Sequence, residues 1–240
     1  MIERVPENRN RLLASLPSED LGLLTPHLVH LDMGKGALLC DPGDPIEHVY
    51  FPHDCVVSLM TLMSRGVAVE STTIGREGAY GLAAAVAPRV ALSRAIIQVA
   101  GRASRIEVPR LREAWKQSET LRSLVDRHTE ALYGHAIQSV ACNALHSVEA
   151  RFCRWLLTCH DRIDSNRVAL TQEFLADMLG VQRTTVTAVA RAMQGAGLIQ
   201  YRRGVVEILD RAGLEAIACE CYGAVRRTYE RLLPETRLSA

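Results

Sequence analysis

The segment from Val181 to Gly204 concentrates positive charge in a chain that is otherwise almost neutral. The 240 residues carry 28 lysines and arginines against 27 acids, a formal net charge of +1. This segment contains no acid, and its basic residues are Arg183, Arg191, Arg202 and Arg203. Clustered cations can neutralise backbone phosphates, so the pattern is typical of a nucleic-acid-binding surface.

Capping and apolar residues predict that two consecutive helices hold the first of these arginines. Thr171 is placed to cap the first helix, and Gly180 supplies the left-handed residue that ends it. The second helix, 183–193, hides Val186, Val189, Ala190 and Met193 and leaves an N-terminal arginine and small or hydroxylated side chains outside. An exposed face of this kind suits a recognition helix in the major groove, where arginine can bind guanine through two hydrogen bonds. An αα-hairpin with a solvated face is the alternative.

Residues 197–209 follow the second helix and alternate like two short strands around the turn Arg202-Arg203-Gly204. A hairpin at this place predicts a winged helix-turn-helix, whose wing arginines contact phosphates and give affinity without sequence information. The candidate DNA-binding residues are Thr171, Gln172, Gln182, Arg183, Thr184, Thr185, Thr187, Ala188, Arg191, Arg202 and Arg203.

A long helical region precedes this domain. After Pro109 the pattern is helical as far as the turn at 161–166, with a break expected near 118–120. Within it, seven residues recur at alternating spacings of four and three, which predicts a seam for pairing with a second copy: Leu121, Val125, His128, Leu132, His135, Ser139 and Cys142. A core helix that packs on its own domain is the alternative, because several of these residues are small or polar.

The N-terminal half is rich in short β-segments separated by Gly, Pro and Asp turns. Strands are expected at 48–51, 55–62, 67–74, 95–99 and 103–108, with a short buried helix at 80–87. The chain is therefore predicted to be α+β, with an N-terminal β-roll, similar to a jelly roll, as a sensor domain. The expected units are a helical lead-in at 1–27, the β-roll at 28–108, a dimerisation helix at 109–146 and a winged helix-turn-helix at 147–240.

Several classes of protein are disfavoured. The longest apolar stretch, 81–88, is far below the ~18 residues of a membrane-spanning helix, and residues 1–4 lack the apolar core of a signal peptide. A cytoplasmic protein without a membrane partner is expected. The seven cysteines include no C-x-x-C pair, which predicts reduced thiols and no metal site. Enzyme motifs such as a nucleophile elbow or a P-loop are missing, so a non-enzymatic protein is expected.

Two groups of residues resemble the Crp/Fnr family of bacterial transcription regulators. The first runs from Gly36 to Asp44 and into Val49-Tyr50-Phe51. The second combines Thr171-Gln172-Glu173, Leu179-Gly180-Val181 and Arg183-x-Thr185-Val186. The resemblance implies a homodimeric regulator that binds a pseudo-palindromic double-stranded DNA operator, with RNA polymerase as a candidate further partner. A ligand-binding signalling module whose C-terminal domain contacts protein is the alternative function.

Residue by residue, the resemblance implies that Arg183 reads guanine. Thr184 and Ala188 stand where members that read the family's best-known operator carry Glu and Arg, so that operator is not expected here. The effector site departs further, because the ribose-binding Glu is replaced and the phosphate-binding Arg and its Ser are in swapped order. Cyclic AMP is therefore disfavoured, and the weak effector-pocket candidates are Gly75, Tyr80, Gly81, Ser93 and Arg94. An iron–sulfur cluster is disfavoured because clustered N-terminal cysteines are missing, while eight histidines leave haem open.

Overall fold

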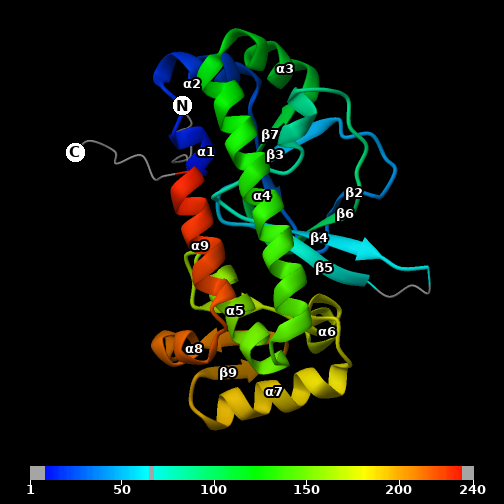
Figure 1. Cartoon of the computed structure of the whole chain (residues 1–240), viewed down its shortest axis with the longest axis vertical. Coiled ribbons are helices and arrows are strands. Elements are labelled where there is room, and N and C mark those ends of the chain that lie inside the picture. The colour runs from blue at the N-terminus through cyan, green and yellow to red at the C-terminus, as the bar shows by residue number, and fades with distance from the viewer. Residues whose placement is uncertain (1–8, 65–67, 234–240) are drawn as a thin grey trace.

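The computed structural model describes residues 9–64 and 68–233. The molecule is elongated, with the β-roll towards one end, a small helical domain at the other, and one long helix running between them (Figure 1). The α+β architecture predicted from the sequence is confirmed. No helix in the described ranges is long and apolar enough to cross a lipid bilayer.

The β-roll is built from two antiparallel sheets with strand orders β1-β7-β3 and β2-β6-β4-β5. Its strands are β1 (Val29–Met33), β2 (Leu38–Cys40), β3 (His48–Pro52), β4 (Val56–Leu62), β5 (Ala68–Ile74), β6 (Arg94–Val99) and β7 (Gly101–Glu107). The five predicted strands are confirmed to within two residues, although Val67 lies outside the described residues. Strands β1 and β2 were not predicted, because they are short and bury few side chains.

The lead-in is helical, as predicted, and consists of two short helices and a 3-10 turn: α1 (Arg11–Ala14), α2 (Ser18–Leu24) and η1 (Thr25–His27). Residues 1–8 of the expected lead-in lie outside the described ranges. The Asn10 side-chain oxygen caps α1 by accepting from the backbone N–H groups of Leu12 and Leu13. The buried helix expected at 80–87 is η2 (Leu82–Ala85), also a 3-10 helix.

The central helical region divides into α3 (Val108–Gln117), α4 (Glu119–Leu145) and α5 (Val148–His160). The predicted first break lies at Ser118, whose backbone is extended and whose hydroxyl caps α4 by accepting from Leu121 N at 2.9 Å. A second break at His146 was not predicted; there the backbone is extended again, with φ −106° and ψ 148°. The unit expected at 109–146 therefore contains two helices.

The predicted seam of α4 is buried within its own protomer. Six of its seven residues are buried, and Leu132 packs against the core of the β-roll. His128 Nε2 accepts from Ala79 N at 3.1 Å, and His135 Nδ1 lies 2.9 Å from Thr72 Oγ1. These contacts favour the alternative of a helix that packs on its own protomer, and the assignment of the seam to a dimer interface stays a prediction. The spacing identified a buried face of the helix but could not say what covers it.

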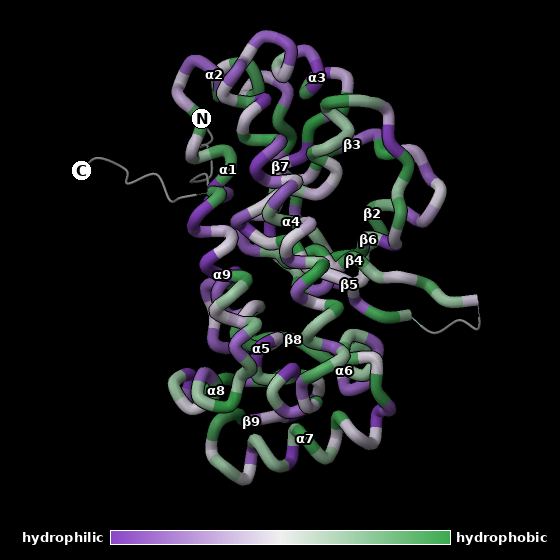
Figure 2. The backbone as a smooth tube through the Cα atoms, viewed as in Figure 1, coloured by the Kyte–Doolittle hydropathy of each residue, from purple (hydrophilic) through white to green (hydrophobic). Residues whose placement is uncertain are grey.

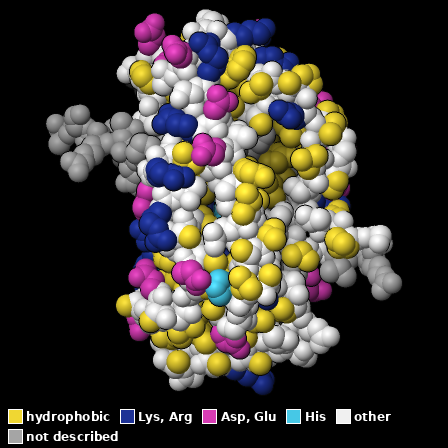
Figure 3. All heavy atoms as spheres, viewed as in Figure 1, with side chains coloured by type: hydrophobic (Ala, Val, Ile, Leu, Met, Phe, Trp, Pro, Cys, Tyr) yellow, Lys and Arg dark blue, Asp and Glu magenta, His cyan; other side chains and the backbone are white. Residues whose placement is uncertain are grey.

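The opposite face of α4 carries exposed apolar side chains. Tyr133, Ile137 and Val140 are 69%, 53% and 71% exposed, and Leu145 is 79% exposed. Figure 3 shows hydrophobic side chains over this helix, on the face turned to the viewer. The first three are spaced by four and three residues, which aligns them along one side of the helix.

The C-terminal domain surrounds a small antiparallel sheet of order β8-β10-β9. The elements that follow α5 in the described chain are β8 (Arg167–Ala169), α6 (Gln172–Leu179), α7 (Arg183–Gly195), β9 (Ile199–Arg202), β10 (Val205–Ile208), α8 (Arg211–Ile217) and α9 (Cys221–Leu232). The colour alternates along α7 between hydrophobic and hydrophilic residues, as in an amphipathic helix (Figure 2).

The final helix, α9, leaves this domain and returns along α4 towards the sensor (Figure 1). The two helices run antiparallel. Arg127 Nη1 on α4 donates to the carbonyl of Leu232 at 3.3 Å, and Gln138 Nε2, farther along α4, contacts Cys221 Sγ at 3.0 Å. The sensor body therefore includes the last helix of the described chain.

Candidate nucleic-acid interface

The two predicted helices of the helix-turn-helix are confirmed as α6 and α7. Thr171 Oγ1 accepts from Phe174 N at 3.2 Å, so it caps α6 as expected. Gly180 ends α6 in the left-handed conformation, with φ +62°. In α7, Val186, Val189, Ala190 and Met193 are buried, which leaves the opposite face of this helix outside.

The outward face of α7 contains most of the candidate base-reading residues. Gln182, Arg183, Thr184, Ala188 and Arg191 are exposed, whereas Thr185 and Thr187 are half-buried. The Thr187 hydroxyl lies 2.9 Å from Gln172 Oε1, a contact that joins the first turn of α6 to α7. Both side chains are half-buried, and their contact helps to fix α7 relative to α6.

The wing is a two-residue hairpin between β9 and β10. Arg203 and Gly204 both have positive φ, at +50° and +74°, which is the arrangement of a type I′ turn. Arg202 and Arg203 are exposed at its tip. The Leu170 N–H donates to the Gly204 carbonyl at 2.7 Å, so the wing lies beside Thr171 at the start of α6. Two of the predicted DNA-contacting segments, the wing and the start of α6, are therefore neighbours.

The four arginines of this surface carry uncompensated charge. Among the residues that the structure describes, none of Arg183, Arg191, Arg202 and Arg203 forms an ion pair with a carboxylate. A surface of exposed cations and hydroxyl groups can bind phosphate oxygens and the acceptor atoms of bases.

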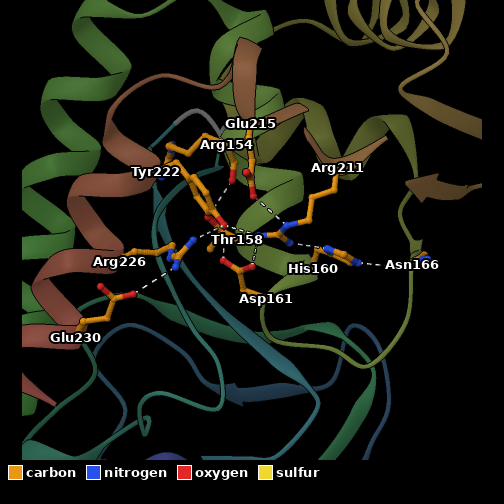
Figure 4. Close-up of polar contacts among 10 residues, drawn as sticks. All are labelled: Arg154, Thr158, His160, Asp161, Asn166, Arg211, Glu215, Tyr222, Arg226 and Glu230. Atoms are coloured by element: carbon orange, nitrogen blue, oxygen red, sulfur yellow. Dashed lines mark hydrogen bonds and ion pairs between the residues drawn. The ribbon is translucent and has the colours of Figure 1, made fainter. Parts of the chain in front are cut away.

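A second group of arginines lies where the C-terminal domain meets the sensor, and these are paired. Asp161 accepts from Arg211 Nη2 at 2.7 Å and from the Tyr222 hydroxyl at 2.8 Å (Figure 4). Arg226 extends this network to Glu230, 3.3 Å away. The network borders a cavity of about 560 Å³, whose lining includes Arg76, Glu77, Asp161, Arg162, Arg211 and Tyr229.

The contact between the C-terminal domain and the sensor is called the joint here. Its most buried ion pair links Arg162, just after α5, to Glu77 in the sensor. Arg162 Nη2 donates to Glu77 Oε1 at 2.6 Å, and both side chains are buried. Burial alone would raise the pKa of Glu77, but the adjacent Arg162 guanidinium outweighs it and holds this pKa below the usual value. This pair could not be predicted from local sequence patterns, because 85 residues separate its members.

Glu70 on β5 is a second acid of the joint, and its contacts are with neutral donors. It accepts from Ser58 Oγ at 2.7 Å, Gln98 Nε2 at 3.0 Å and Trp155 Nε1 at 3.1 Å. Burial raises the pKa of Glu70 to about 7. Its protonation therefore changes near neutral pH, at a point where α5 contacts the sensor.

The predicted effector-pocket residues have different surroundings in the structure. Arg94 is held by Asp41 through contacts of 2.6 and 2.9 Å, and Gly75 packs against the Arg162 side chain. Tyr80 lines a small cavity of about 60 Å³, next to Gly81, whose φ is +81°. Ser93 is half-buried beside Arg94. The assignment of these five residues to an effector site stays a prediction, and the pairing of Arg94 with Asp41 weighs against Arg94 as a phosphate ligand.

The histidines that left haem open are in part committed to other contacts. His53 Nε2 lies 2.7 Å from Ser104 Oγ, and burial lowers the pKa of His53 to about 4. His48 on β3 is half-buried. His53 is therefore a hydrogen-bonded turn residue. Haem binding by another histidine stays a prediction that the structure does not test.

Four possible metal ligands come together at the end of α4. They are Cys142, His146, Cys219 and Cys221, and their ligand atoms all lie within 4.8 Å of one another. The spacing rules for metal motifs could not identify this group, because Cys142 and Cys219 are 77 residues apart.

Comparison with known proteins identifies the domain type and the fold. Residues 150–217 match the Crp-like helix-turn-helix domain family. A search of curated proteins finds no match. The match to residues 150–217 confirms the predicted helix-turn-helix and the resemblance of this domain to Crp/Fnr regulators.

Solved structures of Crp/Fnr regulators have the same fold. FixK2 from Bradyrhizobium japonicum is 16% identical, with a TM-score of 0.68, over 80% of this chain and 98% of that one. A protein assigned to the Crp/Fnr family from Eubacterium rectale is 18% identical, with a TM-score of 0.64, over 88% and 99%. The c-di-GMP-responsive regulator CLP from Xanthomonas campestris is 15% identical, with a TM-score of 0.60, over 80% and 99%.

Proposed function

The chain carries a Crp-like helix-turn-helix domain at residues 150–217 within the fold of the Crp/Fnr transcription regulators, and we propose that it binds a specific double-stranded DNA operator as a homodimer in the cytoplasm. The observation that carries the proposal is the set of exposed arginines on α7 and the wing, which lack carboxylate partners among the described residues. Cations in this state release counterions from DNA when they bind it.

Base reading and phosphate binding belong to different parts of this surface. Arg183 stands at the start of α7, where a recognition helix enters the major groove, and we assign it to a base. Arg202 and Arg203 stand on the wing, and we assign them to phosphates. Thr184, Thr187 and Ala188 let the helix backbone approach the base edges.

Selection from random DNA sequences by the purified full-length chain tests this function. We expect a pseudo-palindromic site whose half-sites are about one duplex turn, ~34 Å, apart. Affinity for this site is expected to fall steeply with added salt, as counterion release requires. Failure to enrich any sequence, together with salt-independent binding, would favour the alternative in which the C-terminal domain contacts protein.

We assign the dimer contact to the outward face of α4, in place of the buried seam. Tyr133, Ile137 and Val140 form an exposed apolar row there, on the helix that leads into the DNA-binding domain. A parallel pair of such helices would place two recognition helices on successive major grooves. Ile137→Asp is expected to give monomers in sedimentation, whereas Thr120→Asp, exposed near the start of the same helix, is the control and keeps the dimer. A dimeric Ile137→Asp variant would move the interface elsewhere.

We also propose that the sensor does not use cyclic AMP as its effector. The ion pair of Arg94 with Asp41 supports this, because a cyclic phosphate would have to displace a carboxylate at 2.6 Å. Calorimetry with millimolar cyclic AMP is expected to show no heat of binding, and a micromolar dissociation constant would overturn the proposal. Contact with RNA polymerase stays a prediction of the family resemblance.

A further inference from the structure

Three cysteines and one histidine form a compact group where the sensor meets the DNA-binding domain. Cys142 lies on the last turns of α4, and His146 is the residue at which α4 ends. Cys219 lies between α8 and α9, and Cys221 is the first residue of α9. All three cysteines are buried. The group therefore sits where the chain enters the DNA-binding domain and where it returns from it.

We propose that these four side chains bind one Zn²⁺ ion. Thiolate and imidazole are the ligands that zinc takes in structural sites, where four ligands surround it tetrahedrally. Zn–S bonds of ~2.3 Å in a tetrahedron place two sulfurs about 3.8 Å apart. Here the Sγ atoms of Cys142 and Cys219 are 3.5 Å apart, and Cys221 Sγ is 3.5 Å from His146 Nδ1. Small side-chain adjustments would bring all four to a shared ion.

The short distances within the group favour one metal ion over a cluster of several metal atoms. In an iron–sulfur cluster the protein thiolates are divided among two or more iron atoms, so thiolates on different irons stand farther apart than ligands of one ion. All four ligand atoms here lie within 4.8 Å of one another. Hard cations such as Mg²⁺ or Ca²⁺ prefer oxygen ligands and do not fit a site rich in sulfur.

Residues around the group resemble the supporting shell of a zinc site. His146 Nε2 lies 3.1 Å from Glu220 Oε2, so a carboxylate holds the ring and leaves Nδ1 facing Cys221. Metal-binding histidines commonly donate their second N–H to a carboxylate in this way. Gln138 Nε2 also contacts Cys221 Sγ at 3.0 Å and would donate to a thiolate there.

The local charge also suits a bound metal. Three thiolates and a neutral imidazole around Zn²⁺ carry a net charge of −1. Arg151, which is buried on α5, lies close enough for electrostatic interaction with Cys142 and Cys219. Its Nε is buried and has no hydrogen-bond partner among the described residues. Apolar packing of buried thiols would account for the cysteines, but not for a histidine oriented by a carboxylate towards them.

Metal binding by the full-length protein tests the proposal without DNA, so its failure is distinguishable from failure of the proposed function. The reduced protein is titrated with Zn²⁺ in competition with a chromophoric chelator, and zinc K-edge absorption reports the ligands. We expect one Zn²⁺ per chain bound by three sulfurs and one nitrogen.

Variants assign the site to these residues. Cys219→Ser is expected to lower Zn²⁺ affinity at least 100-fold, whereas Cys40→Ser, which alters a buried cysteine of the β-roll, is the matched control and leaves it unchanged. Glu220→Gln changes an exposed side chain that does not threaten folding, and it is expected to lower affinity about tenfold by releasing His146. Less than stoichiometric Zn²⁺ in the wild-type protein, or equal affinity in wild type and Cys219→Ser, overturns the proposal.

Discussion

The arginines at the two ends of the DNA-binding domain differ in whether a carboxylate pairs with them. On α7 and the wing, Arg183 and Arg202 are exposed and have no carboxylate partner among the described residues. At the joint with the sensor, Arg162 and Arg211 are bound to Glu77 and Asp161. The two surfaces belong to one domain, and what differs is the supply of acids around each arginine.

This difference separates arginines that are available to bind DNA from arginines that stabilise the contact between the two domains. An unpaired surface cation keeps its charge available for a ligand that carries phosphates. A cation paired in a buried site contributes through its fixed partner, and removal of either member leaves the other charge uncompensated. Substitutions at the joint are therefore expected to act on folding, and substitutions on α7 and the wing on DNA binding.

The largest effect is expected from Arg162→Ala. This change leaves Glu77 buried without its cation, which typically costs about 3–5 kcal/mol of unfolding free energy. Urea unfolding of the purified protein measures it. Arg191→Ala, which removes an exposed arginine of α7, is the control and should stay within about 0.5 kcal/mol of wild type. Equal stability of the two variants would remove the distinction between the surfaces.

Glu70 provides a pH test of the joint. Its pKa is about 7 in the folded protein and near 4.5 in the unfolded chain, so the folded state holds more protons between these values. Unfolding free energy is therefore expected to fall as pH rises from 4.5 to 7, by up to about 3 kcal/mol from this group. Because buried histidines titrate with the opposite sign, the measurement is the difference between wild type and Glu70→Gln. A difference that stays constant over this range would contradict the assignment.

Arg183→Ala should affect recognition and leave stability unchanged. Loss of a two-bond contact to guanine is expected to cost about 1–3 kcal/mol on the selected operator and to relax the preference at one base pair per half-site. Binding to scrambled DNA should change little. Anisotropy titrations on both DNAs check this, and an equal loss on both would assign Arg183 to a phosphate and move base reading to Gln182, Thr184 or Thr187.

Arg202→Ala is expected to have the smallest effect on any one DNA. A phosphate contact is indifferent to sequence, so operator and scrambled DNA should weaken alike. The slope of log K against log salt should become shallower by about one per arginine removed, or about two for a symmetric dimer. Salt titrations distinguish the variants, since a slope unchanged from wild type would take Arg202 out of the DNA contact.

The DNA-binding half could be predicted from the sequence because its determinants are local. Thr171, Gly180 and the apolar spacing of α7 act within one or two turns of the helices that they define. The wing follows directly from Arg203 and Gly204, which close a two-residue hairpin. The third strand of this sheet, β8, was missed because only three residues form it and two of them are exposed.

The joint and the metal-ligand group could not be predicted because they depend on distant segments. The pattern of α4 correctly indicated a buried face, but the partner of His135 is Thr72, 63 residues away. The same limit hid the group around Cys142, whose members come from both ends of the DNA-binding domain. The same holds within the sensor. Arg94 pairs with Asp41, which lies on another turn, so local spacing could not predict this ion pair.

The return of α9 along α4 makes the DNA-binding domain an insertion in the sensor body. The chain leaves this body at His146 and rejoins it at Cys221, and the side chains of these two residues are in contact. Domains whose ends lie close together can be exchanged or removed with little disturbance of the surrounding fold. We therefore expect that a short loop in place of 147–218 would leave α4 and α9 paired as a helical hairpin on the β-roll. In evolutionary terms, one sensor body of this design can accept different output domains at a single junction.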